Sequence, residues 1–228
     1  MATNDNTLSY LDNYCERAGE SGLLAEPLNA VTNLFFIFYA LRIAHLLYRM
    51  PNRTFRHCWD IWLLTVILAI IGVGSGLWHT YATRWSVLMD VIPIALFIHF
   101  YLVFFLRRAF NFGRIKTLLG WLAFIGLTTL FELFASPDML NGTIMYVPTY
   151  VTLVVIALAC YRYNRVIAPH IWIVIAIWTA SLLFRTIDNS ICDSFPYGTH
   201  FVWHIFNSIV LYRLLKILVA HQQPVRTA

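Results

Sequence analysis

Long apolar stretches separated by short polar breaks dominate the pattern along the chain. A helix needs about 20 mostly apolar residues to cross the hydrocarbon core of a bilayer. Stretches that meet this requirement lie at about 27–48, 59–80, 86–106, 115–135, 144–161, 167–185 and 200–219. They are continuously apolar rather than alternating with a period of two, which argues against transmembrane β-strands. The pattern therefore predicts an all-α protein, a seven-transmembrane helix bundle whose membrane domain covers residues 27–219.

Composition supports a membrane protein and excludes several other classes. Hydrophobic residues make up 60% of the chain and charged residues only 12%, whereas soluble domains carry about 25% charged residues. Disordered chains and coiled coils need abundant charge, and small disulfide scaffolds need far more than the four cysteines present. The net charge of +5 comes without a polybasic run, so we expect no nucleic-acid partner.

The distribution of Lys and Arg predicts the orientation of the helices. If the N-terminus lies outside, only Arg17, Arg84 and Arg185 fall on the outer side, which leaves 13 of the 16 basic residues (16 minus 3) on the cytoplasmic side. Cytoplasmic loops of membrane proteins are enriched in Lys and Arg. We therefore expect an extracytoplasmic segment at 1–26, too polar and acidic to be a cleavable signal peptide, and a cytoplasmic tail at 220–228.

The cysteines divide between the two sides in this orientation. Cys15 and Cys192 lie outside, where disulfides persist, while Cys58 and Cys160 lie at the cytoplasmic ends of their helices. The topology therefore predicts a disulfide between Cys15 and Cys192. The alternative is that all four cysteines are unpaired and serve as small core residues.

Polar side chains from three predicted helices lie at one depth near the outer side. Ser75 and His79 are four residues apart, as are His200 and His204, so each pair lies on one face of its helix. Asp90 begins the third helix at the same level. Ionisable groups inside membrane spans are costly and usually functional.

Three histidines and a carboxylate at one depth indicate a zinc site, because catalytic zinc keeps three protein ligands and one open position. His79, His200 and His204 are the expected zinc ligands. No Glu follows the first histidine of the last pair, so the base must come from elsewhere, and Asp90 is the candidate. Ser75 could stabilise an oxyanion. The alternative is that these histidines form interhelical hydrogen bonds, which contribute about 0.6 kcal/mol each.

In their order along the chain, these residues resemble the alkaline ceramidase family, within the membrane hydrolase superfamily that also contains the progestin and adiponectin receptors. The resemblance extends from about residue 12 to 219. The matching motifs are Cys15-Glu16, Glu26-Pro-Leu-Asn29-Ala-Val-Thr32-Asn33-Leu34, Gly74-Ser75-Gly-Leu-Trp-His79 with Asp90 eleven residues on, Ile187-Asp188-Asn189-Ser-Ile-Cys192, and His200-Phe-Val-Trp-His204.

This resemblance implies a seven-helix fold with Zn²⁺ held by His79, His200 and His204, and with Ser75 and Asp90 as catalytic residues. It also implies the disulfide between Cys15 and Cys192. The family further has a Ca²⁺ site near the N-terminus. Of its implied ligands this chain keeps Glu16 and Glu26, while Asn13 stands where an Asp is usual and Ala18 where an Asn is usual.

The predicted function is zinc-dependent hydrolysis of the N-acyl amide of a ceramide-like lipid, which yields a sphingoid base and a fatty acid. The expected partners are the lipid substrate and a membrane, either a bacterial inner membrane or an internal eukaryotic one. One alternative is a lipid-binding receptor or structural zinc protein of the same superfamily. A coupled transporter is the other, although such proteins usually show interrupted helices in two repeats.

Overall fold

The computed structural model describes residues 11, 13–20, 22–50 and 55–220 of the chain. Its elements are α1 (Pro27–Thr32), α2 (Leu34–Arg49), α3 (Phe55–Tyr81), α4 (Arg84–Arg108), α5 (Arg114–Glu132), η1 (Met139–Tyr146), α6 (Val147–Tyr163), α7 (Ala168–Ile187), η2 (Asp188–Ser190) and α8 (His200–Ala220), where η marks a 3₁₀ helix. Within these ranges there is no β-strand, which confirms the all-α prediction.

Seven helical segments are long and apolar enough to cross a membrane, which confirms the predicted bundle of an integral membrane protein. The fifth segment begins differently from its prediction. Its regular helix begins at Val147 rather than at residue 144, because η1 precedes it and contains positive φ values at Leu140, Asn141 and Gly142. The outward orientation of the N-terminus stays a prediction. Of the predicted tail at 220–228, residues 221–228 lie outside the described ranges.

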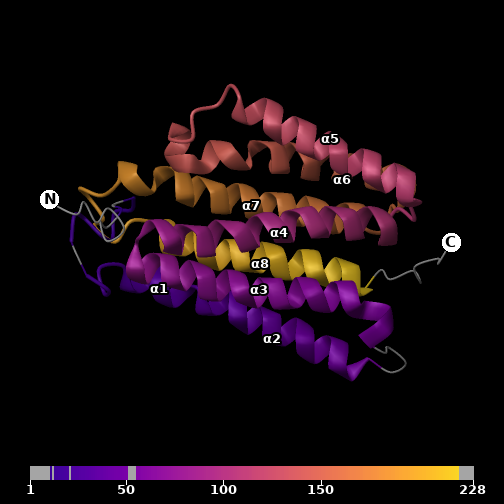
Figure 1. Ribbon diagram of the computed structural model, residues 1–228, viewed down its shortest axis with the longest axis horizontal. Helices are drawn as coiled ribbons and strands as arrows, with labels where there is room; N and C mark the ends of the chain where they lie inside the picture. Colours follow the sequence, from indigo (N-terminus) through magenta and orange to yellow (C-terminus); the bar gives the residue numbers. More distant parts are fainter. Residues whose placement is uncertain (1–10, 12, 21, 51–54, 221–228) are drawn as a thin grey trace, which may run out of the picture.

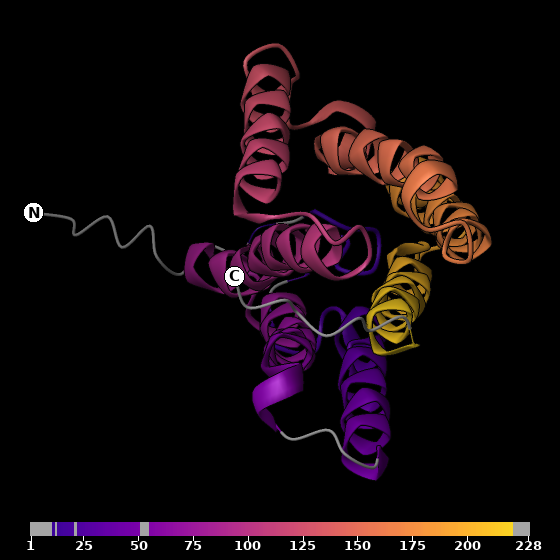
Figure 2. The same ribbon diagram turned by 90° about the vertical axis from the view of Figure 1, so that its right-hand side faces the viewer.

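The spans lie lengthwise along the long axis of the molecule (Figure 1), and their contacts form a ring in chain order. Each helix from α2 to α8 contacts the next, and α8 also contacts α2 and closes the ring. Figure 2 shows α8 between α2 and α7, with α5 at the periphery. The first span consists of α1 and α2, which meet at Asn33, where the Asn33 amide donates a hydrogen bond to the Asn29 carbonyl (2.8 Å). The ring places the N-terminal ends of α1, α4 and α8 beside the C-terminal ends of α3 and α7.

Two glycines allow α3 to approach its neighbours closely. A Cβ atom at Gly74 would lie 1.9 Å from the Met89 carbonyl oxygen of α4, and one at Gly72 would lie 2.9 Å from the Asn33 carbonyl oxygen. Only glycine permits such contacts between helix backbones. At this contact α3 touches α4 through Gly74, the residue before Ser75, and Met89, the residue before Asp90.

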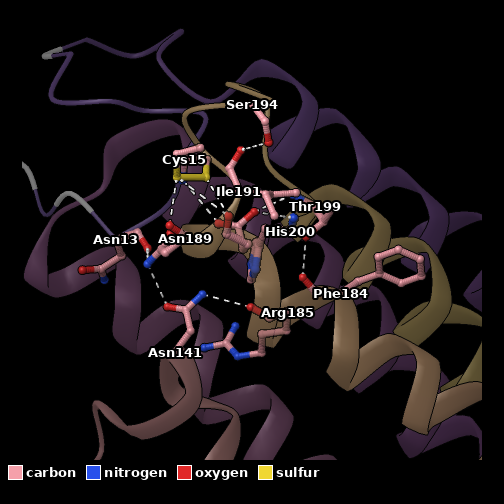
Figure 3. Close-up of a disulfide and its surroundings, with 12 residues drawn as sticks. Asn13, Cys15, Asn141, Phe184, Arg185, Asn189, Ile191, Ser194, Thr199 and His200 are labelled. Carbon is pink, nitrogen blue, oxygen red and sulfur yellow. Dashed lines mark hydrogen bonds between the residues drawn. A yellow bond between two sulfur atoms is a disulfide. The ribbon is translucent and has the colours of Figure 1, made fainter.

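A disulfide between Cys15 and Cys192 links the N-terminal segment to the loop before α8 (Figure 3). The Asp188 carboxylate accepts hydrogen bonds from the backbone amides of Cys15 (3.3 Å), Thr199 (2.6 Å) and His200 (2.8 Å). It thereby holds the N-terminal segment against the first residue of α8. The other two cysteines, Cys58 and Cys160, are buried in α3 and α6.

Candidate metal centre

Three buried histidines converge where α3 ends and α8 begins. One ring nitrogen from each of His79, His200 and His204 lies within 4.8 Å of those of the other two. The ring centroids are 5.1 Å apart for His79 and His200, and 4.7 Å apart for each of the other two pairs. The four-residue spacing within α8 puts two of the rings on one helix face, as predicted, and α3 packs against that face.

Glu26, directly before the first span, and Thr32 within it orient these rings. Oε2 of Glu26 lies 2.5 Å from Nδ1 of His79, and the Thr32 hydroxyl lies 3.0 Å from Nδ1 of His204. Ligating histidines in metal sites usually hold their second ring nitrogen in this way, which fixes the tautomer and the ring plane. Thr32 stands in one of the motifs that resemble the family, but the sequence assigned it no role, and only the helix packing reveals its contact with His204.

The remaining nitrogens of the cluster fit a metal. Nε2 of His79, Nδ1 of His200 and Nε2 of His204 are buried and have no hydrogen-bond partner among the described residues. Leaving a buried polar atom without a partner costs about 1–3 kcal/mol. Neutral imidazole is a preferred ligand of zinc and related transition metals. The arrangement therefore suits a divalent metal better than a set of interhelical hydrogen bonds.

Ser75 and Asp90 are also buried at this end of the bundle. Ser75 precedes His79 by one helical turn of α3, and the close contact at Gly74 brings the Asp90 backbone nitrogen to the surface of α3. The Ser75 hydroxyl and Oδ1 of Asp90 have no hydrogen-bond partner in the part of the chain that the structure describes. The Ser75 hydroxyl lies close enough to the Asp90 carboxylate to interact with it, so the two groups adjoin one site.

The N-terminal segment covers the cluster. The Tyr14 ring stacks on His200, with centroids 3.9 Å apart and planes 28° apart, and lies 5.1 Å from the ring of His79. Burial raises the pKa of the Tyr14 hydroxyl above its usual value. Tyr14 directly precedes the disulfide at Cys15, so that link holds the ring in place. No sequence motif identified Tyr14 as a site residue.

The proposed calcium ligands have protein partners instead. Glu16 accepts hydrogen bonds from the backbone amides of Leu28 (2.6 Å) and Asn29 (2.8 Å). Glu26 accepts one from Nε of Arg17 (2.6 Å) in addition to its contact with His79.

Arg17 is fully buried and supplies the positive charge that a cation would bring. Its guanidinium also donates to the carbonyl groups of Glu20 (3.3 Å), Gly22 (3.3 Å) and His79 (3.4 Å). Burial raises the pKa of Glu26, and the hydrogen bond from Arg17 opposes this shift. This donor-rich surrounding does not fit Ca²⁺, which requires six to eight oxygen ligands.

Comparison with protein families agrees with this geometry. The family model described as Ceramidase matches residues 7–224. The chain belongs to the ceramidase family. A search of curated proteins gives no significant match. Membership in the ceramidase family makes the chain a ceramidase-like hydrolase with a lipid substrate, and the histidine cluster is consistent with a metal cofactor.

Proposed function

We propose that the protein is a zinc-dependent amidohydrolase that cleaves the N-acyl amide of a ceramide-like lipid within the membrane. The observation that carries this proposal is the convergence of three unpartnered imidazole nitrogens in a chain of the ceramidase family. His79, His200 and His204 would hold the ion. Zinc bound there would supply a Lewis acid that polarises the amide carbonyl and activates water.

The side chains around the histidines would do the rest of the chemistry. The Asp90 carboxylate would accept a proton from the attacking water at Oδ1 and pass it to the leaving amine. The Ser75 hydroxyl would donate a hydrogen bond to the oxyanion that develops on the carbonyl oxygen. Glu26 and Thr32 would keep the rings of His79 and His204 in position.

The acyl chain would enter an apolar cavity of about 80 Å³ that lies inside the ring of helices. Its lining includes Phe97 and Tyr101 of α4, Tyr146 of η1, Trp178 of α7 and Leu211 of α8. An acyl chain reaching this cavity between helices would stay in an apolar phase throughout. Access from the lipid would explain why a hydrolytic site lies at membrane depth, in a bacterial inner membrane or an internal eukaryotic membrane.

The test compares metal content with turnover. Purified protein should contain about one zinc per chain, and His79→Ala should lose it. Asp90→Asn should keep the zinc but hydrolyse a fluorescent ceramide about 10²–10⁴-fold more slowly, because a neutral amide cannot accept the proton. Asp193→Asn, at an exposed carboxylate in the loop before α8, is the matched control and should retain activity.

Two results would contradict the proposal. Wild-type turnover by Asp90→Asn would remove its role as a base. Zinc binding and lipid binding without any turnover by the wild-type protein would favour the receptor-like alternative.

A further inference from the structure

Arg17 and Arg108 are buried in the bundle, whereas Arg185 is half-buried and has no ion-pair partner among the described residues. Arg17 pairs with Glu26, and Arg108 pairs with Asp60. Arg185 of α7 forms no ion pair with any residue that the structure describes, and its buried Nε has no hydrogen-bond partner there. A buried donor without a hydrogen-bond partner is unfavourable in the folded protein. The two paired arginines show how this chain neutralises a guanidinium that has only a structural role.

The surroundings of Arg185 compensate its charge only in part. Tyr14 forms a hydrogen bond with the guanidinium, and the Asp90 and Asp188 carboxylates attract it from beyond ion-pair distance. The guanidinium carbon lies 5.2 Å from the centroid of the Trp203 ring and 5.7 Å from that of the Tyr146 ring. Such contacts attract a cation without using its hydrogen-bond donors, and Nε of Arg185 has no partner among the described residues. The Asn141 amide donates to the Arg185 carbonyl at 2.9 Å and fixes the backbone (Figure 3). Gly142, with φ of 74°, makes room for the guanidinium, because a Cβ atom there would lie 3.0 Å from its Nη2.

Arg185 lines a polar cavity of about 410 Å³ next to the histidine cluster. Tyr14, Asn13, Asn141, Asn189 and Asp138 also line it. Tyr14 stacks on His200, so the cavity adjoins the candidate metal ligands. Tyr146 contacts Arg185 and also lines the apolar cavity assigned above to the acyl chain. A scissile amide between the two cavities would thus have its acyl side in the apolar one and its amine side in the polar one.

We propose that this polar cavity binds an anionic group, a carboxylate or phosphate, on the amine side of the substrate, and that Arg185 pairs with it. The inference rests on the proposed N-acyl amide hydrolysis and narrows its substrate class to lipids with an acidic group close to the amide nitrogen. A guanidinium binds both anions through paired hydrogen bonds. The exposed Asp138 carboxylate also lines the cavity, and its negative charge weakens the attraction between the cavity and an anion.

The experiment uses three substrates with one acyl chain and different amine sides. These are N-dodecanoyl ethanolamine, which is neutral, N-dodecanoyl glycine, and N-dodecanoyl phosphoethanolamine. The readout is kcat/KM for each anionic substrate divided by kcat/KM for the neutral one. We expect a ratio of about 10 or more for at least one anion in the wild-type protein, since charge-assisted pairs contribute about 1.5–3 kcal/mol. The anionic substrate that gives the larger ratio shows whether the cavity prefers a carboxylate or a phosphate.

Variants test whether Arg185 causes the preference. Arg185→Gln should bring the ratio to about 1, Arg185→Lys should keep part of it, and Asp138→Asn should raise it. Arg84→Gln, which removes an exposed charge at the same end but outside the cavity, should leave the ratio as in the wild-type protein. A wild-type ratio near 1, or an equal loss of activity on all three substrates in Arg185→Gln, would overturn the inference.

A binding measurement separates this inference from the proposed function. N-dodecylsulfonyl glycine and N-dodecylsulfonyl ethanolamine carry a sulfonamide in place of the amide and are not cleaved. Tighter binding of the glycine compound, lost in Arg185→Gln, would support the anion site even if the wild-type protein cleaved none of the three amides. Equal binding of the two compounds would overturn it, whatever the hydrolysis results.

Discussion

Buried charge is arranged differently at the two ends of the bundle. At the end where α3 begins and α4 finishes, the Asp60 carboxylate accepts hydrogen bonds from Nε and Nη2 of Arg108, and that guanidinium also donates to the His57 carbonyl (2.8 Å). At the other end, about 28 Å away along α3, polar atoms of Ser75, Asp90 and the histidine cluster have no partner among the described residues.

This difference separates a structural use of polar groups from a chemical one. The Asp60 and Arg108 charges find all their partners within the chain and away from the histidine cluster, so they hold helices together. Buried atoms without partners cost free energy in the folded protein, and a ligand or metal can repay that cost by binding. Residues of α3 and α4 take part at both ends, and α8 adds two histidines at one of them. The contrast between the ends therefore comes from the side chains and not from the fold.

The strongest test of the contrast is Asp60→Asn, which should lower the free energy of unfolding by about 3–5 kcal/mol because Arg108 then lies buried without a counterion. The measurement is reversible unfolding in detergent. Arg107→Gln, at the adjacent residue, is the control and should have little effect. If Asp90→Asn lowered the stability as much as Asp60→Asn, the two ends would not differ in the way described.

A smaller effect is expected for Glu26→Gln, which should weaken zinc binding about 10–100-fold because the amide orients His79 less firmly than the carboxylate. Competition with a zinc-binding dye measures the affinity. Glu20→Gln changes a nearby exposed carboxylate whose side chain makes none of these contacts, and it should bind zinc like the wild-type protein. Unchanged zinc affinity in Glu26→Gln would limit Glu26 to its pairing with Arg17.

The smallest effect is expected on removal of calcium. EGTA in a zinc-buffered solution should change hydrolysis less than about twofold, because each carboxylate oxygen of Glu16 and Glu26 already accepts a hydrogen bond from the chain, which disfavours the oxygen cage that Ca²⁺ needs. A loss of activity that added Ca²⁺ restores would show that these carboxylates do bind the ion. It would also mean that the polar atoms near Arg17 are less fully satisfied than their hydrogen bonds indicate.

The sequence predicted the elements of the site better than their contacts. Apolar segment length identified the seven spans, and spacing of four residues brought His200 and His204 onto one face. Tyr14 and Thr32 escaped notice because their roles depend on how the N-terminal segment and α1 fold back onto α3 and α8, which no local pattern encodes. Arg185 did carry a signal, since an ionisable residue inside a span is unusual.

Helix ends were harder to predict than helices. Hydropathy placed the start of the fifth span at residue 144, but η1 continues to Tyr146. Within η1, three consecutive residues, Leu140, Asn141 and Gly142, have positive φ values. Apolar residues in a 3₁₀ turn look the same to a hydropathy pattern as residues in an α-helix. Asn141 and Gly142 of η1 both contact Arg185, so this helix boundary, which hydropathy did not locate, lies beside Arg185.

The bond between Cys15 and Cys192 joins residues 177 positions apart, and this separation has a consequence for biosynthesis. The ribosome must complete the first six spans before the second cysteine emerges, so the aromatic cover at Tyr14 is secured only at the end of translation. Newly made chains should therefore pass through a stage with assembled helices and an uncovered histidine cluster. Production in a host that lacks oxidising machinery on the appropriate side of its membrane would leave the protein at that stage.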